Sequence, residues 1–216
     1  MYIRRIIIII VSVEKTHTSE EVKMIKCFTG PMFSDKSAYL VEIYEQLWNK
    51  DISISFKPEI DSRDGDSIKS KKYPDKTIPA QFVKTTDDIL KYIIEGNYKT
   101  VLIDEAQFLS GNARDLVDLS VILDIDFYIA GLNMTSEQEP FGFMQDILAV
   151  SDETIHVHGY CQDCNKPSYY SYSLSSDKVG QIKVGDEYIS LCPNCLKRRI
   201  LQKRGKKLML RSEEYK

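Results

Sequence analysis

Residues 30–37, Gly-Pro-Met-Phe-Ser-Asp-Lys-Ser, have the spacing of a phosphate-binding loop, with a glycine six positions before a Lys-Ser pair. In such a loop, backbone N–H groups at a helix N-terminus surround phosphate oxygens, the lysine reaches the outer phosphates, and the hydroxyl holds magnesium. Residues 24–29 suffice as the strand before the loop, and apolar residues recur at helical spacing over residues 35–48. The motif therefore predicts an α/β unit with a phosphate site between its first strand and its first helix.

Asp35 stands where the phosphate-loop pattern has its second glycine. A unit charge about 4 Å from a phosphate charge costs roughly 4 kcal/mol at an effective dielectric constant near 20, and about 1.4 kcal/mol is tenfold in affinity. A backbone with positive φ at this position adds about 1 kcal/mol. Because magnesium and Lys36 offset part of this cost, we expect the substitution to weaken ATP binding about ten- to thousandfold.

The chain up to about residue 155 alternates predicted strands with predicted helices. This alternation predicts a parallel sheet with helices on both faces. Residues 61–76 are rich in Asp, Ser and Lys and are predicted to form a mobile loop. The predicted strands are residues 51–56, 77–83, 100–103 and 127–131, and the predicted helices after the first are residues 85–95 and 113–123.

Charge and hydropathy exclude two classes of partner. The net charge of -3 gives no bulk attraction to nucleic acid, and the basic clusters at residues 197–199 and 203–207 are interpreted as a solvated helix face and tail. The apolar run at residues 6–11 is far shorter than the roughly 20 residues of a membrane-spanning helix. It also lacks a signal-peptide cleavage site after it. Residues 1–23 are an N-terminal extension, which could reflect an upstream start codon, an added edge strand or an interaction arm.

The pair Asp104-Glu105 ends the predicted strand at residues 100–103. In proteins with a phosphate-binding loop, an acidic residue at the end of a later strand holds magnesium, directly or through water. Asp104 fits that role, and Glu105 would reach the substrate side of the nucleotide. The alternative is a surface strand end without function, but the loop, the strand and their order together favour the magnesium site.

Four of the five cysteines form two Cys-x-x-Cys pairs. Two such pairs supply the four thiolates of a tetrahedral structural zinc site, and structural zinc lets a lobe with a thin core fold. We expect Cys27 to be a core thiol. The predicted zinc ligands are Cys161, Cys164, Cys192 and Cys195.

From about residue 24 to residue 200, the order and spacing of five motifs resemble the type II thymidine kinase family. That resemblance implies a kinase that moves the γ-phosphoryl group of ATP to the 5′-hydroxyl of thymidine for DNA synthesis, with a zinc lobe whose lasso loop closes over the nucleoside. The motifs are residues 30–37, Lys57-Pro58-x-x-Asp61-x-Arg63, Asp104-Glu105-Ala106-Gln107-Phe108, Gly131-Leu132 with Pro140-Phe141-Gly142, and the two Cys-x-x-Cys pairs with Tyr188 between them.

The resemblance also implies a role for individual residues. Glu105 is the implied general base on the 5′-hydroxyl, and Arg63 and Asp61 are implied to lie near the transferring phosphate. The residues implied to bind ATP phosphates and magnesium are Gly30, Ser34, Lys36, Ser37 and Asp104. The residues implied to line the nucleoside pocket are Met32, Phe108, Phe141 and Tyr188.

Other positions depart from the family pattern. In the turn after the last predicted sheet strand, Asn133 and Ser136 stand where the family has an aspartate and an aromatic residue, so one wall of the base pocket is predicted to be lost. Glu137 replaces a polar or basic residue. Ser70-Lys71 stands where the family has Ser-His. These changes favour either an impaired catalyst or a changed ligand.

Two hypotheses follow. The first is a thymidine kinase that uses ATP, Mg²⁺ and structural zinc; the second is an inactive homologue that binds a nucleotide or a partner protein. We expect a cytoplasmic homo-oligomer, a tetramer by resemblance, with no membrane or nucleic-acid partner. The predicted domains are the extension at residues 1–23, a nucleotide-binding domain at 24–155, a zinc-binding lasso lobe at 156–205 and a tail at 206–216.

Overall fold

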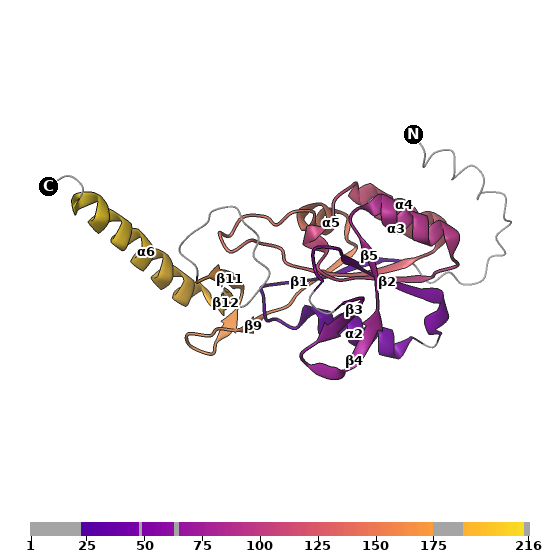
Figure 1. Cartoon of the computed structure of the whole chain (residues 1–216), viewed down its shortest axis with the longest axis horizontal. Helices are drawn as coiled ribbons and strands as arrows, with labels where there is room; N and C mark the ends of the chain where they lie inside the picture. Colours follow the sequence, from indigo (N-terminus) through magenta and orange to yellow (C-terminus); the bar gives the residue numbers. More distant parts are fainter. Residues whose placement is uncertain (1–22, 48, 63–64, 175–187, 214–216) are drawn as a thin grey trace.

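A six-stranded parallel sheet forms the centre of the protein (Figure 1). The computed structural model describes residues 23–47, 49–62, 65–174 and 188–213, with the backbone alone for residues 204–213. The strand order is β5-β2-β6-β7-β1-β8, and every neighbouring pair runs parallel, which confirms the predicted fold class. The strands are β1 (Ile25–Thr29), β2 (Ser53–Pro58), β5 (Gln81–Val83), β6 (Thr100–Ile103), β7 (Asp126–Gly131) and β8 (Glu153–His156).

Helices cover both faces of the sheet, as predicted. On one face lie α3 (Thr86–Glu95), α4 (Ala113–Leu123) and α5 (Met144–Val150), and on the other lies α2 (Lys36–Gln46) (Figure 1). Alternate strand residues point to opposite faces. The cluster under α3, α4 and α5 therefore contains Val101, Ile103, Phe127 and Ile129, whereas the cluster under α2 contains Phe28, Leu102 and Ala130.

The predicted loop at residues 61–76 is wrong in its second half. β3 (Ser67–Ser70) and β4 (Tyr73–Pro79) form an antiparallel hairpin beside α2 (Figure 1). Its cause is Ile68 and Ile78, which face each other in register and are buried against Leu40 and Val41. Since each strand buries only one apolar residue within a polar sequence, the alternation is too short to be recognised. The predicted strand at 77–83 divides after Pro79, and only β5 joins the sheet.

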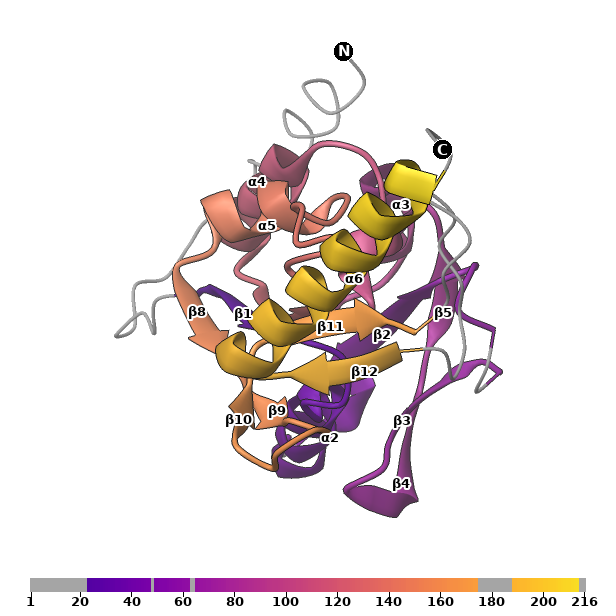
Figure 2. The ribbon, with the colours of Figure 1, turned by 90° about the vertical axis from the view of Figure 1, so that its left-hand side faces the viewer.

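The chain after β8 forms a small lobe (Figure 2). Two antiparallel pairs build it, β9 (Gly159–Tyr160) with β10 (Pro167–Ser168) and β11 (Tyr170–Ser173) with β12 (Tyr188–Leu191). The last element, α6 (Pro193–Glu213), begins in this lobe and runs across the predicted boundary between lobe and tail. Short 3₁₀ helices η1 (Lys50–Ile52) and η2 (Ala106–Phe108) follow α2 and β6.

Several predictions from the sequence concern residues outside the described part of the chain. These are the role of residues 1–22 in the N-terminal extension, Trp48 in the first helix, Arg63 in the site, and residues 175–187 of the predicted lasso lobe. Within the described ranges, no helix is both long enough and apolar enough to span a membrane.

Candidate active site and metal centre

The predicted phosphate-binding loop, residues 30–37, lies between β1 and α2 and includes the start of α2. Gly30 has φ of 156°, and a Cβ atom there would lie 2.0 Å from the carbonyl oxygen of Val157. This position is therefore restricted to glycine for both conformational and steric reasons. The loop also contacts the small lobe, because the Met32 N–H donates to Ser171 Oγ at 2.9 Å.

Lys36, the lysine of the loop, folds back over it. Its Nζ donates to the Pro31 carbonyl oxygen at 2.7 Å and to Ser34 Oγ at 3.4 Å, and Ser34 itself is buried. Burial lowers the pKa of Lys36, and the charges of Glu105, Asp104 and Asp35 oppose that shift. The negative charges of these three carboxylates thus favour the charged form of the ammonium group.

Asp35 is the N-cap residue of α2 and has a left-handed backbone, with φ of 55° and ψ of 35°. The backbone of Asp35 therefore has the positive φ that was considered for this position from the sequence. Aspartate tolerates such a φ better than most residues do. The exposed side chain makes no capping hydrogen bond to the helix. Its carboxylate thus adds negative charge at the phosphate site without serving to cap the helix.

Ser37 and Asp104 meet across the first turn of α2. Ser37 Oγ donates to Asp104 Oδ2 at 2.8 Å, and the Glu105 N–H donates to Asp104 Oδ1 at 3.0 Å. Burial and the charge of Glu105 raise the pKa of Asp104 to about 7, although the Ser37 hydrogen bond works in the opposite direction. A hydroxyl and a carboxylate so placed form the oxygen donor set that magnesium prefers.

Glu105 is held by a residue to which the sequence analysis gave no role. Gln107 Nε2 donates to Glu105 Oε2, and Gln107 Oε1 accepts the Leu132 N–H at 2.9 Å. Gln107 is buried and its amide is thereby fixed between η2 and the end of β7. Glu105 itself has a left-handed backbone with φ of 49°, which turns the chain sharply after β6. Its side chain is half-buried.

The predicted nucleoside-pocket residues Phe108 and Phe141 are brought together. Their rings meet edge to face with centroids 5.4 Å apart, and both side chains are half-buried. Gly142 permits this approach, because it has φ of 51° and a Cβ atom there would lie 2.2 Å from the Gln107 carbonyl oxygen. Met32 is half-buried in the phosphate loop, and Tyr188 is half-buried in the lobe at the start of β12.

Asp61 contacts a buried lysine of the same motif, to which the sequence analysis gave no individual role. Lys57 Nζ lies 3.4 Å from Asp61 Oδ2 and donates to the Ser67 carbonyl oxygen at 3.2 Å. The side chains of Lys57 and Asp61 are only 2% and 6% exposed. Both residues lie at the carboxyl end of β2, beside Asp104 at the end of β6. This is the edge of a parallel sheet where ligands bind.

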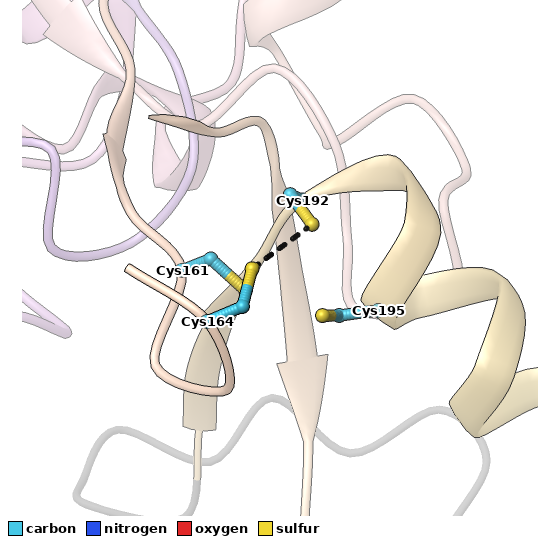
Figure 3. Close-up of side chains that lie close together, drawn as sticks. All are labelled: Cys161, Cys164, Cys192 and Cys195. Atoms are coloured by element: carbon cyan, nitrogen blue, oxygen red, sulfur yellow. Dashed lines mark hydrogen bonds between the residues drawn. The ribbon is translucent and has the colours of Figure 1, made fainter. Parts of the chain in front are cut away.

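The four predicted metal ligands gather in the small lobe (Figure 3). Their Sγ atoms all lie within 4.8 Å of one another, and Cys164 Sγ is 3.6 Å from Cys192 Sγ. Zinc bound to four thiolates at about 2.3 Å requires sulfur atoms about 3.8 Å apart. The donor set and its spacing therefore fit a structural zinc ion. Cys27, by contrast, is buried in the core of the sheet domain, as predicted.

Neighbouring charges support the cysteine cluster. Asp163, between the first two cysteines, accepts hydrogen bonds from Arg199 Nε at 3.1 Å and Nη2 at 2.6 Å. Arg198 Nη2 donates to Cys195 Sγ at 3.3 Å. Burial opposes ionisation of Cys161, but N–H groups of Cys192 and Asp163 outweigh it and lower the pKa of Cys161 to about 6. Thiolates are the form that binds zinc.

The family model for thymidine kinase matches residues 23–196. The chain belongs to the thymidine kinase family. The match includes the phosphate-binding loop, Asp104-Glu105 and all four cysteines of the metal centre. The resemblance inferred from the five motifs is therefore confirmed.

Curated members of the thymidine kinase family are similar over most of the chain. The thymidine kinase of Onion yellows phytoplasma is 33% identical over 159 residues, which cover 73% of this chain and 75% of that protein. The thymidine kinase of Pseudothermotoga lettingae is 31% identical over 173 residues, covering 77% and 90%. That of Ureaplasma urealyticum is 28% identical over 191 residues, covering 82% and 85%.

Proposed function

We propose that the chain is a thymidine kinase that transfers the γ-phosphoryl group of MgATP to the 5′-hydroxyl of thymidine. The observation that carries this proposal is the hydrogen bond between Ser37 and Asp104 beside Lys36 and Glu105. It brings the residues of two separate motifs into one phosphate site. Membership of the thymidine kinase family supports the choice of nucleoside.

Phosphoryl transfer requires positioning of the two substrates and neutralisation of charge on the transferring group. In the proposed site, the loop N–H groups around Gly30 and Ser34 bind phosphate oxygens, and Lys36 moves from the Pro31 carbonyl oxygen to the phosphates. Ser37 and Asp104 would hold magnesium, which would supply positive charge to neutralise the phosphates. For Asp104 this role requires the ionised carboxylate, which the Ser37 hydrogen bond favours.

Glu105 is the proposed general base. A base must lie within hydrogen-bond reach of the proton that it removes and must keep its geometry as the substrate arrives. Gln107 supplies that geometry, because its amide donates to one carboxylate oxygen and is itself anchored by the Leu132 N–H. The second oxygen of Glu105 then accepts the proton of the 5′-hydroxyl. Arg63, outside the described residues, and Asp61 are proposed to lie by the transferring phosphate.

The proposed nucleoside pocket is formed by Phe108, Phe141, Met32 and Tyr188. Phe108 lies three positions after Glu105, so a thymine ring bound against the edge-to-face pair of Phe108 and Phe141 would place its sugar toward the proposed general base. We further propose that the protein is a cytoplasmic homotetramer, on the grounds of the family resemblance.

The test is a phosphorylation assay with γ-labelled ATP and thymidine, combined with calorimetric titration of each substrate. We expect phosphorylation by the wild type, micromolar binding of MgATP, and loss of phosphorylation in Glu105→Gln with MgATP binding kept. Asp35→Gly is expected to bind MgATP more tightly. If the wild type binds neither substrate while Asp35→Gly binds MgATP, the natural chain is not a thymidine kinase.

A further inference from the structure

The β3–β4 hairpin reaches the phosphate-binding loop from a separate part of the chain. Ile68 and Ile78 are buried against α2, the helix that follows the loop, so the hairpin is fixed relative to it (Figure 1). At its turn, the Lys72 N–H donates to the buried Ser70 Oγ at 3.2 Å, which orders the backbone on both sides of Lys71. The turn therefore has an ordered backbone next to the predicted phosphate-binding loop.

Lys71, Lys72 and Lys76 of this hairpin differ in the groups that their ammonium groups contact. Lys72 Nζ lies 2.8 Å from Glu42 on α2, and Lys76 Nζ lies 3.3 Å from Glu45. Lys71 Nζ instead lies over the ring of Phe33, 5.4 Å from its centroid. Within the described part of the chain, no carboxylate pairs with Lys71. Its ammonium group is thus directed to the phosphate loop rather than to the helix.

Phe33 belongs to the phosphate-binding loop and lies two residues before Asp35. It has φ of 61°, and its ring is 41% exposed. A lysine over this exposed side chain therefore contacts the loop itself rather than the helix that follows it. Lys71 therefore brings positive charge to Phe33, two positions along the chain from Asp35.

Because the proposed ATP site carries negative charge, a further cation there would favour the binding of phosphates. Residues 30–37 contain one cation, Lys36, and one anion, Asp35, and the carboxylate of Asp104 reaches the same segment through its hydrogen bond with Ser37. A nucleoside triphosphate adds more negative charge, and magnesium and Lys36 neutralise only part of it. Positive charges close to the phosphates of a ligand raise the affinity for that ligand and speed its association.

We propose that Lys71 is a further phosphate-binding cation of the ATP site, which offsets the carboxylate of Asp35. This inference rests on the function proposed above and extends it to a residue of the hairpin. In the free protein Lys71 rests on the Phe33 ring, and its flexible side chain can turn from there to the outer phosphates when MgATP binds.

The experiment is calorimetric titration of MgATP into the full-length wild type and its Lys71→Met, Lys71→Arg and Lys72→Met variants. Lys72→Met is the matched control, since it removes the same charge one residue away from a lysine that pairs with Glu42. We expect Lys71→Met to raise Kd about two- to fivefold, as for an exposed charge pair. Lys71→Arg is expected to keep wild-type affinity, and Lys72→Met to change it less than Lys71→Met does.

Asp35→Asn is expected to lower Kd, and the double variant with Lys71→Met to return it toward the wild-type value. Equal effects of Lys71→Met and Lys72→Met, or no effect of Lys71→Met, would overturn this inference while leaving the kinase proposal intact. A wild type that binds no MgATP would overturn both. The Lys71→Met effect should also shrink in concentrated salt, because exposed charges are screened.

Discussion

Ser37 Oγ donates a hydrogen bond to Asp104 Oδ2 at 2.8 Å, although 67 positions separate the two residues in the sequence. The parallel sheet produces this contact, because β1 and β6 both border β7 and end at the same edge. The hydroxyl satisfies a buried carboxylate that would otherwise lose its water partners at a cost. The same two oxygen atoms are the proposed magnesium ligands, so the metal would replace this hydrogen bond.

Replacing Ser37 by alanine is expected to weaken magnesium binding about 10- to 100-fold, the usual cost of losing a supporting group at a metal site. Phosphorylation should then require a correspondingly higher magnesium concentration. The hydrogen bond lowers the pKa of Asp104, so its loss also favours the protonated form that does not bind metal. Phosphorylation rates measured across a magnesium titration test this. Unchanged magnesium dependence would contradict the assignment of Ser37.

Gln107→Leu is expected to lower kcat with little change in the Kd of MgATP. The variant keeps the side-chain volume but removes the amide that donates to Glu105 and accepts the Leu132 N–H. A base without its orienting donor loses part of the roughly 10²- to 10⁴-fold contribution of general base catalysis. Gln107→Glu serves as the companion variant, because the carboxylate that it introduces would repel the carboxylate of Glu105. An unchanged kcat in Gln107→Leu would show that Gln107 does not orient the base.

The motifs that chemistry fixes could be predicted from the sequence, whereas residues whose roles depend on tertiary contacts could not. The phosphate loop, Asp104-Glu105 and the cysteine pairs have spacings set by phosphate or metal geometry. Gln107 acts through a left-handed turn at Glu105 and a backbone group of Leu132, which no local pattern reveals. A buried lysine such as Lys57 looks in sequence like any exposed lysine.

Removing zinc is expected to unfold the small lobe while the sheet domain keeps its structure. The lobe's apolar core consists largely of the cysteines with Leu191 and Leu196, which is too little to hold it without metal. Thermal unfolding with and without a chelator, combined with zinc analysis of the protein, measures this. One equivalent of zinc per chain and an early chelator-sensitive transition are the expected results; a zinc-free protein that melts in the same way would contradict them.

Asp163→Asn is expected to weaken zinc binding, because it breaks the bidentate contact with Arg199 that joins the first cysteine pair to α6. Loss of such a supporting contact typically costs about 10- to 100-fold in metal affinity. Competition with a chromogenic chelator measures that affinity directly. Arg114→Gln on α4 provides a control, since Arg114 forms an exposed ion pair with Asp118, 3.7 Å apart, in the sheet domain.

Asp88 makes the stability of the protein depend on pH through the capping box of α3. Burial alone raises the pKa of Asp88, but hydrogen bonds from Lys91, from the Lys84 N–H and from Thr85 outweigh it and lower the pKa to about 2. A folded-state pKa below the unfolded value of about 3.9 stabilises the fold above pH 4, and this contribution is lost as the pH falls toward 2. Urea unfolding of the wild type and Asp88→Asn should therefore differ most above pH 4 and converge below it. Thr85→Ala removes the side chain that caps α3 and should lower the free energy of unfolding by about 1 kcal/mol in the same assay.

Lys57→Met is expected to destabilise the protein by about 3–5 kcal/mol, the usual cost of breaking a buried ion pair by removing one of its two members. Lys57 and Asp61 are almost fully buried at the edge of the sheet, 3.4 Å apart, and Lys57 also holds the start of β3 through the Ser67 carbonyl oxygen. The double variant Lys57→Met, Asp61→Leu removes both charges and should recover much of the loss. Chemical denaturation of the three proteins measures these differences. If the double variant is no more stable than Lys57→Met alone, the hydrogen bond to Ser67 rather than the ion pair fixes this loop.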